Sequence, residues 1–278
     1  MCVPELKIET NDHEQFAEQL GSLVDAGKYS FLSDTQLDNN FDAWASAAAE
    51  SRVSEEEKAA ASAQIGALAI DHGTRIDHVR ATIAGGVLTT LRYRTSHPEL
   101  FPQKDYNRLG SQIPYEKPLG LDNYICTSFA DIQHVPSDVR FRFNALEMLS
   151  RPGTLVFPYD APFVHIHLEP SLSADINLQQ RIALRGIDYL KILPTYMAME
   201  ARGGDSNKAG NIWPSFLKEK FSFPYSFRSS EIKILGNVAL GEVYWRLLVH
   251  TALDEHAELV ADLPENVRLE HVFDAKAS

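Results

Sequence analysis

Residues 163–170, Phe163-Val164-His165-Ile166-His167-Leu168-Glu169-Pro170, form the stretch that most constrains the fold of this chain. Apolar and polar side chains alternate along it with a period of two, which predicts a β-strand with one apolar and one polar face. A second strand is predicted at Thr154–Tyr159, and the intervening Asp160-Ala161-Pro162 suits a hairpin turn. The two segments together predict an antiparallel sheet in the middle of the chain.

The polar face of the predicted strand carries His165, His167 and Glu169. Two imidazoles and one carboxylate at positions i, i+2 and i+4 form a facial ligand set of the kind that binds iron in non-haem oxygenases. Residues on one face of a strand lie roughly 6.5–7 Å apart at Cα, so both histidines can reach one ion, while Glu169 has to lean back. The alternative is a half-buried strand whose outer face is simply polar.

Segments with helical spacing are predicted on both sides of this sheet, and a capping box at Ser54–Glu57 starts one of them. The predicted helices are His13–Ala26, Gln36–Glu50, Ala59–Ile83, Val139–Ser150, Ile176–Arg202 and Glu231–Leu263. Val87–Thr95 and Asn123–Ile132 are further predicted strands. The pattern predicts an α+β, mainly α-helical fold, with N-terminal and C-terminal helices around a small central antiparallel sheet. No linker composition interrupts the chain, so residues 1–278 are predicted to form a single globular domain.

His72 falls within the apolar stripe of the predicted helix over Ile65–Ile83, between Leu68 and Ile76. A histidine in such a stripe has to satisfy two ring nitrogens away from water. It is therefore either a core residue bonded to a carbonyl, or a ligand or acid–base group that faces an internal cavity. His78 lies on the opposite side of the same helix and is predicted to be solvated.

His250 and Asp254 fall one turn apart in the apolar stripe of the last predicted helix. A histidine and a carboxylate at this spacing can form a structural pair, a pair of metal ligands, or a base with its orienting carboxylate. The position of both residues on the buried face favours a shared role, and the three alternatives stay open.

Composition excludes several classes of function. The chain has 26 basic and 38 acidic residues and a net charge of −12, which disfavours nucleic acid as a partner. Its two cysteines, Cys2 and Cys126, lack the spacing of a zinc or iron–sulfur site. No secretory signal is visible at the start, and no apolar run is long enough for a bilayer. A cytoplasmic protein without membrane partners is predicted.

The motifs of serine hydrolases, P-loop nucleotidases, zincins and Rossmann dehydrogenases do not occur in the sequence. The histidine-bearing segments instead predict a metal-dependent (iron) or haem-dependent oxidoreductase or oxygenase that acts on a small organic molecule. Non-haem iron would bind His165, His167 and Glu169, and His72, His250 and Asp254 would supply the catalytic groups. Haem or another divalent metal is the alternative cofactor. The alternative function is a non-catalytic small-molecule or partner-binding protein with structural histidines.

Overall fold

The computed structural model describes residues 13–74, 76–100, 116–130, 139–158, 180–202, 214, 226–241, 245–249 and 265–271. The strands in this part of the chain are β1 (Ala69–Thr74), β2 (Val87–Leu88), β3 (Tyr124–Phe129), β4 (Val139–Asn144), β5 (Leu155–Phe157), β6 (Leu184–Arg185), β7 (Glu231–Leu235), β8 (Val238–Ala239), β9 (Trp245–Val249) and β10 (Val267–His271). The α-helices are α1 (His13–Asp25), α2 (Asp34–Ala49), α3 (Glu55–Ser62), α4 (Ile76–Gly85), α5 (Leu91–Ser96), α7 (Ala145–Ser150) and α9 (Gly186–Arg202). Short 3-10 helices are η1 (Ile65–Ala67), η3 (Leu121–Asn123) and η4 (Phe227–Ser229).

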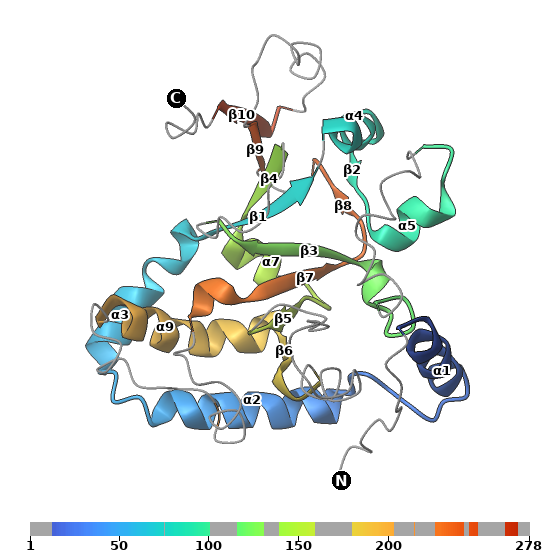
Figure 1. Ribbon diagram of the computed structural model, residues 1–278. Helices are drawn as coiled ribbons and strands as arrows, with labels where there is room; N and C mark the ends of the chain where they lie inside the picture. Colours follow the sequence, from blue (N-terminus) through green and yellow to red (C-terminus); the bar gives the residue numbers. More distant parts are fainter. Residues whose placement is uncertain are drawn as a thin grey trace.

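One large sheet runs through the described part of the chain (Figure 1). Its eight strands follow the order β10-β9-β4-β1-β3-β7-β5-β6. Every neighbouring pair is antiparallel except β9 and β10, which run parallel. Strands β2 and β8 form a separate antiparallel pair. The large sheet is therefore mixed, and strands from the beginning, middle and end of the chain lie side by side in it.

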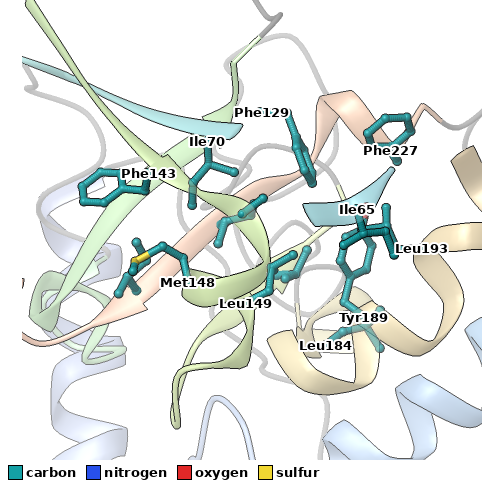
Figure 2. Packing of buried hydrophobic residues seen from close by; sticks show 14 of the residues in the cluster. Ile65, Ile70, Phe129, Phe143, Met148, Leu149, Leu184, Tyr189, Leu193 and Phe227 are labelled. Atoms are coloured by element: carbon teal, nitrogen blue, oxygen red, sulfur yellow. The ribbon is translucent and has the colours of Figure 1, made fainter. Parts of the chain in front are cut away.

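The main hydrophobic core lies on one face of this sheet. Alternation along the central strands places Ile70, Phe129 and Ile232 on that face, where all three are almost fully buried. Helices α7 and α9 cover them, and α2 and α3 pack on α9 (Figure 1). Figure 2 shows how Met148 and Leu149 of α7 and Tyr189 and Leu193 of α9 meet the side chains of the sheet. Burial of this apolar surface is the principal stabilising contribution to the fold.

A second, smaller core lies on the opposite face, beside β5 and β6. Leu155 and Phe157 point to this face, and Leu20 of α1 and Phe31 pack on them. The rings of Phe31 and Phe157 stack with centroids 6.3 Å apart. The sheet is thus covered by apolar groups on both faces at this end. Between this small core and β9, the same face carries polar side chains.

The predicted fold class is wrong. The central sheet is not small and antiparallel, because it has eight strands in the described part of the chain and includes a parallel pair. Four of the predicted helices contain strands of this sheet. They lie at Ala59–Ile83, which contains β1, at Val139–Ser150, which begins with β4, at Ile176–Arg202, which contains β6, and at Glu231–Leu263, which contains β7 and β9.

The error in Ala59–Ile83 has a specific cause. Ile65, Leu68, Ile76 and Ile83 satisfy a helical period across the segment, but β1 lies between them and pairs with β4 over all six of its residues. Pairing with β4 and β3 on both sides overrides the helical period, since ladder hydrogen bonds and core burial outweigh local propensity. The errors at Val139–Ser150 and Glu231–Leu263 ignored a period-two pattern, because Val139–Asn144 and residues 231–234 both alternate apolar and polar residues.

Other predicted elements are confirmed. Helices α1 and α2 lie within two residues of their predicted bounds, and β3 and β5 lie within predicted strands. The capping box is present, with the Ser54 hydroxyl accepting from the Glu57 backbone and the Glu57 carboxylate accepting from the Ser54 backbone. The predicted strand at Val87–Thr95 is confirmed only at β2, because Thr90 caps helix α5 directly after it.

Candidate functional site

Most of the residues predicted to carry chemistry lie outside the described residues. This holds for the predicted metal ligands His165, His167 and Glu169, and also for His250 and Asp254. The segment 245–249 immediately before His250 is strand β9, so the helix predicted to carry His250 and Asp254 does not begin at Glu231. Their predicted roles stay predictions, and His72 is the candidate whose surroundings the structure describes.

His72 lies on β1 at the point where this strand separates from β3. The β1–β3 ladder comprises the pairs Ile70–Phe129 and Asp71–Ser128 and ends there. Beyond the last pair of the ladder, the His72 ring provides the next hydrogen bond between the two strands. Its Nδ1 lies 2.7 Å from the carbonyl oxygen of Cys126 on β3. His72 shares a face of β1 with Ile70, and its side chain is half-buried. The position is enclosed, but it belongs to a strand and not to a helix.

The hydrogen bond defines the protonation state of His72. A carbonyl oxygen can only accept, so Nδ1 carries the hydrogen and donates it to Cys126. Burial lowers the pKa of His72 to about 4, although the bond to Cys126 raises it, and the charges of Arg94 and His78 lower it further. The imidazole is therefore neutral at pH 7, with the lone pair on Nε2 available for a ligand or a proton.

Arg94 forms the cationic side of this site, and His78 lies beside it. His78 of α4 is buried, which makes the prediction that it is solvated wrong, because α4 begins only at Ile76 and its phase differs from that of the predicted helix. The guanidinium Nη1 of Arg94 on α5 lies 3.5 Å from His78 Nδ1. Positive charge beside a neutral imidazole favours an anionic or electron-rich group at this end of β1.

A second cluster, which the sequence did not indicate, surrounds Lys233 of β7. Lys233 is completely buried, and its Nζ lies 2.9 Å from Glu116 Oε1, 3.0 Å from Cys126 Sγ and 3.4 Å from Glu231 Oε1. Cys126 and Lys233 are directly opposite each other in the β3–β7 ladder, on the face away from the main core. A charged side chain at this depth needs partners on several sides, and here two carboxylates and a thiol provide them.

The charge of Lys233 depends on these partners. Burial alone would lower its pKa, but the Glu231 and Glu116 carboxylates raise it well above its ordinary value, so Lys233 is an ammonium at neutral pH. Burial raises the pKa of the Cys126 thiol, and the Lys233 charge only partly opposes this, so Cys126 stays a thiol. The alternation Glu231, Ile232, Lys233, Ile234 is the sequence signal that would have placed Lys233 on a strand, on the same face as Glu231.

An ion pair between β1 and β4 holds the same polar face together. Asp71 is almost completely buried. Arg142 donates two hydrogen bonds to its carboxylate, from Nε to Oδ1 at 2.8 Å and from Nη2 to Oδ2 at 3.0 Å. Arg140 adds a longer contact of 3.9 Å to the same carboxylate. Such a bidentate pair fixes β1 against β4 beside His72 and thereby fixes the direction of the strand that carries the imidazole.

The described residues contain no cluster of three or more histidine, cysteine, aspartate or glutamate side chains arranged to hold a metal ion. Among the helices of the described part, none combines the length and the apolar character that crossing a bilayer requires. Comparison of the chain with family models, with curated proteins and with solved structures gives no match. Function therefore has to be inferred from the residues of the site itself.

Proposed function

We propose that the chain is a metal-dependent oxidoreductase of the oxygenase type that acts on a small organic molecule. The observation that carries the proposal is the neutral and oriented imidazole of His72, whose Nδ1–H is held by the Cys126 carbonyl. A histidine fixed in this way presents one lone pair in one direction, which is what a group in contact with a substrate requires. The Arg94 guanidinium supplies positive charge beside it.

The proposed role of His72 is to accept a hydrogen bond from the substrate. A base with a pKa of about 4 does not keep a proton at pH 7, so it orients a donor group better than it removes a proton permanently. The predicted strand ligands His165, His167 and Glu169 would bind iron, which supplies the redox chemistry when it is present. His250 and Asp254 are proposed as a second acid–base pair, on the strength of their spacing.

The remaining parts of the proposal rest on composition. The net charge of −12 supports a small-molecule substrate over nucleic acid. A cytoplasmic location is supported by the low cysteine content, with Cys126 present as a free thiol.

A non-catalytic binding protein is the second candidate, and one observation favours it. The hydrogen bond of His72 replaces a ladder bond where β1 leaves β3, which is a structural task in itself. In that case the imidazole stabilises the strand end, and substitution would lower stability without affecting any turnover. The two candidate functions therefore differ in two ways. Metal binds only to the oxidoreductase, and substitution of His72 lowers turnover in the oxidoreductase but only stability in the binding protein.

The first prediction concerns metal content. The chain, purified after growth with added iron, should contain one bound iron, which the double substitution His165→Ala and His167→Ala should abolish while far-UV circular dichroism stays unchanged. His97→Ala is the matched control, since the His97 ring stacks on Tyr93 of α5 and His97 is not among the predicted ligands. Elemental analysis and absorbance spectra give the result. A Soret band would favour haem, and absence of metal from the wild type would contradict the proposed oxidoreductase.

A further inference from the structure

The contact between Lys233 and Cys126 has a chemical consequence of its own. The two residues face each other across the β3–β7 ladder, and Nζ lies 3.0 Å from Sγ. Glu116 and Glu231 hold the ammonium from other sides, and Lys233 is completely buried, so the side chain cannot turn away. A nitrogen and a sulfur are thus held at a separation that one bridging atom can span with a small contraction.

We propose that Lys233 Nζ and Cys126 Sγ form a covalent nitrogen–oxygen–sulfur bridge when dioxygen oxidises the pair. One ammonium, one thiol and one dioxygen give the bridge –NH–O–S–, one water and one proton. The N–O and O–S bonds form, and the S–H bond, two N–H bonds and the O–O bond break. Nitrogen and sulfur are each oxidised by two electrons, while one oxygen atom is reduced into the bridge and the other to water.

The surroundings favour the bridge over other products of cysteine oxidation. The carboxylates of Glu116 and Glu231 touch Nζ and can accept the proton that the ammonium releases. Oxidation of a thiol places an oxygen atom on the sulfur, and Lys233 Nζ, 3.0 Å from Sγ, is the nitrogen to which that oxygen atom can bond so that it stays in the bridge. The Cys126 thiol is protonated because burial raises its pKa, so the oxidation is slow and accumulates with exposure to air.

Formation of the bridge would alter both clusters of the site. A bridged nitrogen carries no positive charge, so Glu116 and Glu231 would lose the cation that compensates them. Glu116 begins the described segment that leads through η3 into β3, and Lys233 ties it to the sheet. Cys126 also supplies the carbonyl that orients His72, so the bridge would couple oxidation to that contact. This inference does not depend on the proposed oxidoreductase function.

The experiment uses the full chain with Cys2→Ser, in which Cys126 is the sole cysteine. The protein is kept under oxygen-18 dioxygen or under argon and then digested without reductant. Mass spectrometry should show, only under dioxygen, a linked peptide pair containing Cys126 and Lys233. Its mass should exceed the sum of the two peptides by one oxygen-18 atom less two hydrogens, and reduction with dithiothreitol should restore both peptides.

Two controls and three other products complete the test. Cys126→Ser should abolish the linked pair, whereas Lys191→Arg, a change at the surface of α9, should leave it unchanged. A pair that lacks the oxygen atom would indicate a direct sulfur–nitrogen bond and overturn the oxygen bridge. Sulfinic or sulfonic acid at Cys126, or an unmodified thiol after long exposure, would equally overturn it. Because detection is made on native lysine, the outcome does not depend on a Lys233 variant that fails to fold.

Discussion

His72 lies on β1, on the face that Ile70 shares, and its Nδ1 bonds to the Cys126 carbonyl. A helical wheel places it instead on the apolar stripe of a helix. The expectation of an enclosed imidazole follows from apolar neighbours in either geometry. Its partner could not be predicted, because the Cys126 carbonyl is 54 residues away and becomes available only where two strands separate.

The pH dependence of stability tests the state of His72. Its pKa is about 4 in the folded chain against 6.5 when unperturbed, so between these values the unfolded chain binds a proton that the folded chain does not. The free energy of unfolding should therefore be highest above pH 6.5, fall as the pH drops to about 4, and level off below. The contribution is on the order of 3 kcal/mol.

Urea denaturation of the wild type and of His72→Gln at several pH values measures this contribution. The glutamine amide can still donate to Cys126 but does not titrate, so the variant should lose less stability than the wild type between pH 7 and pH 4. His97→Gln, which removes an imidazole elsewhere, should follow the wild type. Equal losses in wild type and His72→Gln would show that His72 is not held neutral by the fold.

At the scale of elements, sequence patterns that lie within one helix predict that helix correctly. Patterns in segments whose structure depends on pairing with distant strands do not. The capping box at Ser54 and Glu57 is complete within four residues, so the sequence alone identifies it. Strand β1 is different, since its ladder joins residues about 70 positions apart, such as Asp71 and Arg142. Local periodicity cannot report such a pairing, and apolar residues with an accidental helical spacing then favour the wrong element.

The junction of α7 and α9 gives the prediction at this scale. Gly186 begins α9, and a Cβ added there would lie 3.1 Å from Leu149 Cα and closer still to the Leu149 carbonyl. Both atoms belong to the backbone of α7, so they cannot move aside as a flexible side chain would. Gly186→Ala should therefore destabilise the fold by about 1–3 kcal/mol, as overpacking of a close contact does.

Gly66→Ala is the matched control for this change. Nothing lies within 4 Å of a Cβ at Gly66, so the added methyl group meets open space. The control should be neutral or raise stability by about 0.5 kcal/mol through loss of freedom in the unfolded chain. Chemical denaturation of both variants gives the comparison, and an equal effect at the two positions would mean that α7 and α9 do not approach this closely.

On the scale of the whole molecule, the large sheet is assembled from strands that the sequence distributes over some 200 residues, from β1 to β10. The predicted arrangement of helices around a small sheet is wrong at this scale. Each strand that pairs over a long sequence distance enlarges both faces of the sheet, and other parts of the chain must cover these faces. The polar face between the small core and β9 is one result. The buried charges on this face could not be predicted from the sequence. A lysine such as Lys233 is expected to be exposed to solvent unless its partners Glu116 and Glu231 are known.

The last prediction removes the cation from this face. In Lys233→Met the apolar volume is kept, but the buried Glu116 and the largely enclosed Glu231 are left without a compensating charge, which should cost about 3–5 kcal/mol of folding free energy. Adding Glu116→Gln and Glu231→Gln to the same chain removes the uncompensated charges, so much of that loss should be recovered. Lys191→Met, at a surface pair with Asp188, should cost about 0–1 kcal/mol. Denaturation midpoints of the variants test whether the charges are buried together. Only a buried charge cluster makes the triple variant more stable than Lys233→Met alone.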